Sequence, residues 1–184
     1  MFPKTNLPLN IFEERYIEMV DYSLSGDRII GMVQQKSKNE LYDIGCFGKI
    51  TFFNETADKR YLINLEGISC FKILKEVITK NKFRIFEIEV FEKYNHNISK
   101  NSLKAKILDC FKKYNQAKGI NINIDEVRGL NIVDLMKFIA MISPFDVSVK
   151  QMFLEIKSDE DLYERLLSVL EIELASSQHN SSLN

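Results

Sequence analysis

The hydrophobic positions follow two different periods along the chain, and the period changes near the middle. From Arg28 to about Glu92, short runs rich in Ile, Val, Phe and Tyr alternate with polar or glycine-containing turns. The runs are RIIGMVQQ, LYDIGCFGKITFF, RYLINLEGI, SCFKILKEVI and FRIFEIEVF. No helical stretch of about 10 to 15 residues separates them. The pattern therefore predicts a β-sheet folded on itself, a small barrel, rather than a parallel βαβ sheet. Isolated glycines within the runs are expected to mark bulges, bends or close backbone approaches, namely Gly31, Gly45, Gly48 and Gly67.

After residues 94–97 the apolar spacing becomes helical. We therefore expect a barrel subdomain over residues 1–95 and a helical bundle over residues 96–175, an α+β chain. Ser143-Pro144 should end one helix, because the residue before proline is disfavoured in the α region. Ser158-x-x-Asp161 has the spacing of a capping box and should start the last helix. The segment 176–184, rich in Ser and Asn, is expected to be disordered.

The stretch LPLNIFEERYIEMV, residues 7–20, reads as a short strand entering an amphipathic helix at about residues 13–25. Phe12, Tyr16, Met19 and Val20 fall on one helical face that could pack on the barrel. Asn10 could offer its side-chain oxygen to the first N–H groups of the helix. The charged cluster Glu13-Glu14-Arg15 is therefore interpreted as a structural corner rather than a binding site.

The composition of the chain favours no particular class of binding partner. The net charge of −1 favours neither nucleic acid nor an anionic membrane, and 45% hydrophobic residues are enough for a core. Cys46, Cys70 and Cys110 lack paired spacing and are expected to be buried thiols of a reducing compartment, the cytoplasm. The sequence has neither a long apolar span nor a secretory signal, so no membrane association is expected.

The sequence contains no recognisable catalytic or metal-binding motif. The seven glycines form no phosphate-binding loop, and the histidines, His96 and His179, lie in a polar turn and near the C-terminus. Cys and His are too scattered for a zinc site, so no cofactor or metal is expected. The carboxylate pairs Glu87/Glu89 and Glu171/Glu173 are interpreted as solvated faces.

From Lys72 to Lys118, the sequence has twelve Lys and Arg residues and five Asp and Glu residues. This local positive charge leaves RNA binding as an alternative function.

The order of several motifs resembles one known family. LPLNIFEERYIEMV, DRIIGMVQQ, LYDIGCFGKITFFNET, RYLINLEGISCFKI and SPFDVSVKQMFLE together resemble the N-terminal, substrate-binding domain of Lon proteases (ATP-dependent protease La), over about residues 3–170. The resemblance implies a PUA-like pseudo-β-barrel followed by a C-terminal helical bundle. It also implies a bacterial stand-alone, non-catalytic module that binds unfolded or tagged polypeptide, without the ATPase and Ser-Lys protease domains.

The residues that carry the resemblance are expected to be structural, and the residues that bind a client are not identified. These signature residues are Pro8, Leu9, Asn10, Phe12, Glu13, Arg15, Tyr16, Gly31, Gly45, Gly67, Pro144, Phe145, Lys150 and Gln151. Three positions depart from the family pattern. Glu14 replaces a usual proline, Asp58-Lys59 replaces an Asp-Gly turn, and Cys70 replaces a usual arginine.

Relatives usually begin with one more strand, before the segment equivalent to residues 2–6. A barrel without that strand would have an open edge, which could pair with another chain. We therefore expect either a homodimer through this edge or a natural start upstream.

Overall fold

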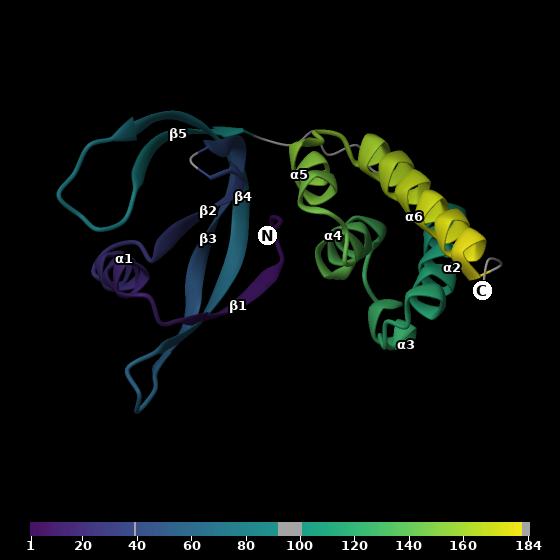
Figure 1. Cartoon of the computed structure of the whole chain (residues 1–184), viewed down its shortest axis with the longest axis horizontal. Helices are drawn as coiled ribbons and strands as arrows, with labels where there is room; N and C mark the ends of the chain where they lie inside the picture. The colour runs from purple at the N-terminus through teal and green to yellow at the C-terminus, as the bar shows by residue number, and fades with distance from the viewer. Residues whose placement is uncertain (39, 92–100, 182–184) are drawn as a thin grey trace. The chain divides into compact units, whose positions relative to one another are not determined.

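The computed structural model describes residues 1–38, 40–91 and 101–181, which form two compact units, Met1–Glu92 and Lys93–Asn184 (Figure 1). The first unit is a curled antiparallel sheet with one helix, and the second is helical. The predicted α+β class, a half-barrel followed by helices, is confirmed. The predicted boundary at residues 95–96, together with His96, lies outside the described residues.

Two long strands form the centre of the sheet. They are β3 (Glu40–Glu55) and β4 (Tyr61–Val77), with β2 (Ile29–Ser37) beyond β3. The first half of β4 also pairs with β1 (Asn6–Ile11) and its second half with β5 (Ile85–Phe91). Because β3 occupies the other edge of β4 over residues 61–72, β1 and β5 follow one another along the same edge.

The sequence predicted two strands where the structure has the single strand β4, so this prediction is wrong. A β-bulge lies between the two runs: Gly67 is opposite Gly48, Ser69 is opposite Phe47, and the register skips Ile68. The bulge bends the strand without ending its pairing. Gly67 also accepts a hydrogen bond from Lys4 N–H (2.7 Å), and a Cβ at Gly67 would collide with the carbonyl oxygen of Phe2.

Helix α1 (Glu14–Leu24) covers one face of the sheet through Val20, which packs with Ile30, Ile50, Ile63 and Leu65. Met19 packs against the same cluster. The prediction that Phe12 shares this packing face is wrong, because Phe12 precedes the helix and its side chain is 67% exposed. The predicted cap is also wrong. Glu13 occupies the N-cap position without a side-chain hydrogen bond, and Asn10 belongs to β1.

The loop between β4 and β5 is attached to α1, which closes the curl of the sheet (Figure 1). Lys82 Nζ lies 3.1 Å from Glu14 Oε1, and the Lys82 N–H donates to Glu18 Oε1 at 3.3 Å. The Phe83 ring lies 5.5 Å from the ring of Tyr22. The β4–β5 hairpin is therefore held by contacts of its loop with α1 as well as by the backbone pairing of the two strands.

The second unit contains the helices α2 (Asn101–Lys118), α3 (Ile124–Val127), α4 (Ile132–Ile142), α5 (Val147–Glu155) and α6 (Asp159–Ser181). The predicted end of α4 is confirmed, since Ser143 is already extended before Pro144. The predicted start of α6 is also confirmed, because the Asp161 N–H donates to Ser158 Oγ at 3.0 Å. The core is made of the fully buried side chains Ile107, Phe111, Tyr114, Leu135, Met136, Ile139, Phe153, Leu166 and Leu170.

The predicted disorder from Ser176 onward is wrong for residues 176–181, which continue α6. Ser176 Oγ donates to Ile172 O at 3.0 Å and Ser177 Oγ to Glu173 O at 2.8 Å. These hydroxyls bond back to the preceding turn, so small polar residues are accommodated in the helix. Residues 182–184 lie outside the described part of the chain.

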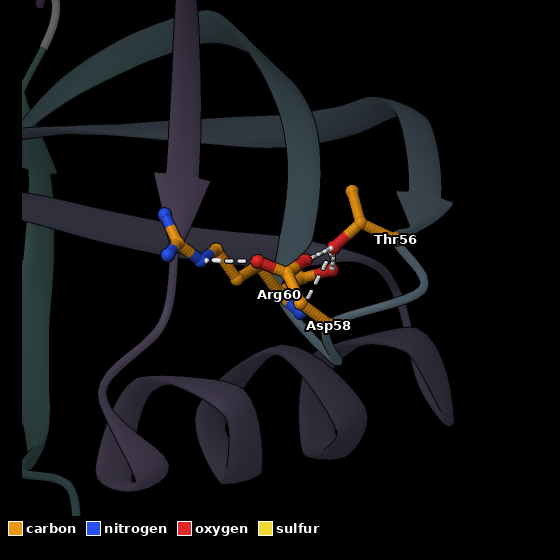
Figure 2. Close-up of polar contacts among 3 residues, drawn as sticks. All are labelled: Thr56, Asp58 and Arg60. Carbon is orange, nitrogen blue, oxygen red and sulfur yellow. Dashed lines mark hydrogen bonds and ion pairs between the residues drawn. The ribbon is translucent and has the colours of Figure 1, made fainter.

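The turn between β3 and β4 is held by a polar network of Thr56, Asp58 and Arg60 (Figure 2). The Arg60 N–H donates to Thr56 Oγ1 at 3.1 Å, and Arg60 Nε lies 2.8 Å from Asp58 Oδ2. The hydrogen bond from Thr56, assisted by Arg60, lowers the pKa of Asp58 below its usual value. Lys59 between them has φ 62°, the left-handed region that favours glycine.

The ring of Phe71 packs against the backbone of Gly31 and Gly45, which we call the glycine floor. Phe71 lies directly opposite Gly45, and its ring also approaches Gly31 on β2. A Cβ at Gly45 would lie 2.6 Å from Cζ of Phe71 and 2.7 Å from the Met32 carbonyl oxygen. The sequence predicted that these glycines allow a close approach, and the group that approaches is the Phe71 ring.

We expect Lys59→Gly to stabilise the protein, because a non-glycine residue in the left-handed region costs about 1 kcal/mol, partly offset by the greater freedom of glycine in the unfolded chain. The expected gain is about 0.5 kcal/mol, measured by urea unfolding followed by circular dichroism. Lys80→Gly is the matched control: Lys80 is exposed and is not among the described residues with positive φ. An equal response of both variants would contradict this account of the turn.

We expect Gly45→Ala to destabilise the first unit by about 1 to 3 kcal/mol, as for other overpacked sites. Gly26→Ala is the control in the same unit, because the nearest atom to a Cβ there is 4.0 Å away. Adding Phe71→Leu to Gly45→Ala should recover part of the loss by removing the ring. Both comparisons use urea unfolding, and equal losses in the two alanine variants would disprove steric conflict with Phe71.

Candidate functional site

The charged corner before α1 is a small surface network. Arg15 Nη2 lies 2.8 Å from Glu13 Oε2, and the guanidinium stacks 4.6 Å from the centre of the Tyr16 ring. Both charged side chains are about half exposed. Among the neighbouring signature residues, Pro8, Leu9 and Asn10 belong to β1, and Leu9 packs against the core cluster. The corner joins a strand to a helix and has no buried polar group that points to a ligand.

The signature residues of the second unit make local contacts of their own. The Phe145 ring, after Pro144, lies 5.6 Å from Tyr114 and 5.8 Å from Phe153. Lys150 Nζ donates to the carbonyl of Met141 at 3.0 Å, near the end of α4, and burial lowers the pKa of this lysine. Gln151 Nε2 donates to Glu155 Oε1 at 2.8 Å. Within each unit, the signature residues are spread over several elements, including Gly31 on β2, Gly45 on β3 and Gly67 on β4.

An exposed apolar surface lies instead on one face of the β4–β5 hairpin. We define the apolar strip as Phe71, Ile73, Phe86, Ile88 and Val90. Phe71 is opposite Val90, Ile73 is opposite Ile88, and Phe86 continues the alternation on β5. Residues directly opposite in an antiparallel pair point to the same face, so these side chains form one row.

The strip has a buried floor and an exposed margin. Phe71 is buried over its glycine floor, whereas Ile88 is 39% and Val90 is 52% exposed. Leu74, at the register shift of β4, is also exposed. Ile88 and Val90 are exposed, β-branched and on the same face as the buried ring of Phe71. They form a surface that an apolar partner could cover.

One end of the strip is marked by an ion pair. Arg84 Nε and Nη2 donate to the two carboxylate oxygens of Glu76 at 2.7 and 2.6 Å, and the guanidinium stacks 4.8 Å from the ring centre of Phe86. The hydrogen bonds from Arg84 lower the pKa of Glu76 and raise the pKa of Arg84. Both groups therefore stay charged at neutral pH, and their charges balance.

The middle of the opposite face of the hairpin is charged. Lys75 Nζ lies 3.1 Å from Glu87 Oε1, and Lys72 is opposite Glu89. Glu87 is thus part of a surface ion pair and Glu89 is exposed, as expected of a solvated face. The apolar pair Val77 and Ile85 lies at the end of this face, next to the charged pairs.

The hairpin also has an open edge. Among the strands that the structure describes, β5 pairs with β4 alone. The outer edge of such a strand presents N–H and C=O groups that an extended chain can join. An apolar row beside an open edge is the arrangement that strand addition uses.

Alternation along residues 84–91 indicates a half-buried strand, but it does not show which element, if any, covers the apolar face. The signal that could have located the strip is the pairing of this run with SCFKILKEVI, which places Ile88 opposite Ile73. Pairing partners are not visible in one sequence, so the strip was missed.

The described residues offer little support for other chemistry. Within residues 1–38, 40–91 and 101–181, no group of three or more His, Cys, Asp or Glu side chains could hold a metal ion. Several basic residues of the 72–118 segment are paired with carboxylates, namely Lys75, Lys82, Arg84, Lys113 and Lys118. None of the helices in the described part of the chain combines the length and apolarity needed to cross a membrane.

Comparison with known proteins identifies the family to which this fold corresponds. Residues 1–172 match the model of the ATP-dependent protease La (LON) substrate-binding domain. The fold is similar to the crystal structure of a Lon N-terminal domain protein from Xanthomonas campestris, with a TM-score of 0.67, 16% identity and 91% of each chain covered. It is also similar to the N-terminal domain of a Mycobacterium avium complex Lon protease, with a TM-score of 0.62, 18% identity, and 95% and 91% of the two chains covered.

A curated Lon protease from Dictyoglomus thermophilum is 26% identical over 99 residues, which cover 50% of this chain and 12% of that protein. The chain therefore spans a small fraction of the length of this relative. Since the family model covers nearly all of the sequence, the chain belongs to the LON substrate-binding domain family.

Proposed function

We propose that this protein is a non-catalytic module that binds unfolded polypeptide segments through the apolar strip and the open edge of β5. The observation that carries the proposal is the apolar row with exposed Ile88 and Val90, on a hairpin whose outer strand has no second neighbour among the described strands. Membership of a substrate-binding domain family supports the same function.

The mechanism follows from the geometry of strand addition. An extended segment beside β5 would form backbone hydrogen bonds with the outer edge of residues 85–91. Every second side chain of the segment would then lie on the same face as the strip, beside Ile88 and Val90. A folded protein keeps its backbone groups paired and its apolar side chains inside. It would therefore offer neither unpaired backbone groups nor accessible apolar side chains for binding.

Binding of this kind should be weak and should not depend on charge. Fully burying an Ile or Val side chain contributes about 1.5 to 3 kcal/mol, and the two exposed residues of the strip are already partly covered. The ordering of the bound segment costs part of this gain. Because Arg84 is balanced by Glu76 and Lys75 by Glu87, selection rests on hydrophobicity and extended conformation.

A second copy of the chain could occupy the same edge, which makes a homodimer a competing state rather than a separate function. Segment binding and self-association would then exclude one another. A cytoplasmic location also belongs to this proposal, since the buried thiols Cys46, Cys70 and Cys110 suit a reducing compartment.

The test uses the double variant Ile88→Thr/Val90→Thr, which keeps β-branched side chains in the strand but makes the strip more polar. We expect its affinity for a fluorescently labelled, permanently unfolded protein to fall about tenfold, equivalent to about 1.4 kcal/mol, measured by fluorescence anisotropy. The control is Val147→Thr/Ile172→Thr, which changes the same two residue types, 50% and 64% exposed, on α5 and α6.

The control variant should bind within about twofold of the original chain, and circular dichroism should show that both variants are folded. Equal losses in the two variants, or none in the strip variant, would remove the strip as the binding surface. A steep fall of affinity with salt would point to phosphate or charge recognition instead, which is the result expected of an RNA-binding module. Light scattering at the working concentration separates self-association from client binding.

A further inference from the structure

Cys46 on β3 and Cys70 on β4 lie directly opposite each other in the sheet. Both are thiols, and each side chain is only 1% exposed. Opposite residues of an antiparallel pair have their side chains on the same face, so the two sulfur-bearing groups are cross-strand neighbours. Nothing in the binding function described above uses them.

The backbone geometry of such a pair is close to that of a disulfide. Opposite residues in an antiparallel pair have Cα atoms about 4.5 to 5.5 Å apart. A disulfide requires Cα atoms about 4.4 to 6.8 Å apart and Cβ atoms about 3.5 to 4.5 Å apart. The strands therefore need at most a small local approach, without a change of register.

We propose that Cys46 and Cys70 form a redox-sensitive dithiol that is oxidised reversibly to a disulfide joining β3 and β4. With hydrogen peroxide as the oxidant, one thiolate attacks a peroxide oxygen, which gives a sulfenic acid and releases one water after protonation. The second thiol attacks that sulfur, the S–S bond forms, and the hydroxyl leaves as a second water. The two electrons lost by the thiols reduce the peroxide, and an external thiol reverses the step by exchange.

The position of the pair links it to the strip. Cys70 precedes Phe71 and Cys46 follows Gly45, so the new bond would join the same two strands on the face opposite to the Phe71 ring and its glycine floor. The bond would hold the β3–β4 register at the point where Cys70 also pairs with the backbone of β5. Burial of both sulfurs means that oxidation must wait for local opening and should be slow.

Cys110 provides an internal comparison. It lies on α2 in the other unit, and burial raises the pKa of its thiol. Because Cys110 belongs to a helix, it is not paired with another cysteine across a β-ladder. Oxidation of Cys110 would add oxygen to one sulfur, whereas oxidation of the proposed pair removes two hydrogens.

The experiment treats the folded full chain with hydrogen peroxide and follows its mass and its tryptic peptides. Lys49 and Arg60 separate the two cysteines, so trypsin places them on different peptides that only a disulfide can join. We expect a loss of about 2 Da, a linked pair of peptides containing Cys46 and Cys70, and reversal by dithiothreitol. The oxidised chain should melt about 5 °C or more above the reduced chain.

Cys110→Ala should leave the linked product unchanged, and Cys70→Ala should abolish it while keeping a small apolar side chain at that buried position. If Cys70→Ala fails to fold, Cys46→Ala serves the same purpose from the other strand. A link that forms only after denaturation, that includes Cys110, or that joins two molecules would overturn the proposal. The mass and peptide readouts do not involve polypeptide binding, so failure here leaves the proposed function untouched.

Discussion

The ladder between β3 and β4 is the interaction on which the rest of the first unit depends. β2 pairs with β3, and both β1 and β5 pair with β4. The residues on which α1 packs also come largely from this ladder, with Ile50 on β3 and Ile63 and Leu65 on β4. A change of one residue in its register would move these side chains to the opposite face and separate Phe71 from Gly45. The fold of the first unit is therefore set by one pairing, and the other strands and α1 pack around it.

The same ladder explains how a stable domain can carry an exposed apolar surface. Along the first half of β4, Ile63 and Leu65 face α1 and are buried. Along the second half, Phe71 and Ile73 share their face with Ile88 and Val90, while Lys72 and Lys75 point the other way. The apolar face thus changes side along one continuous strand, and the bulge at residues 67–69 lies at the change. The exposed part of the strip is anchored by the buried ring of Phe71.

Structural features that depend on neighbouring residues could be predicted from the sequence, whereas features that depend on distant strand pairing could not. Pro144 and Ser158 act within one turn of a helix, and the sequence located both boundaries. Phe12 was wrongly placed because a helical repeat was extended through Glu13, where the backbone is still extended. Asn10 was wrongly assigned a capping role for a similar reason, since its backbone belongs to the ladder with β4.

The strip shows the limit of pattern analysis most clearly. Alternation along residues 85–91 shows which side chains share a face, but not whether another element covers that face. Coverage depends on which strand pairs with β5 and on where α1 packs, and both are set by contacts between residues far apart in sequence. The glycines were easier, because a missing side chain at Gly45 or Gly67 indicates a close approach even when the approaching group is unknown. Sequence therefore identified where the backbone is crowded, while the structure was needed to find where the surface is exposed.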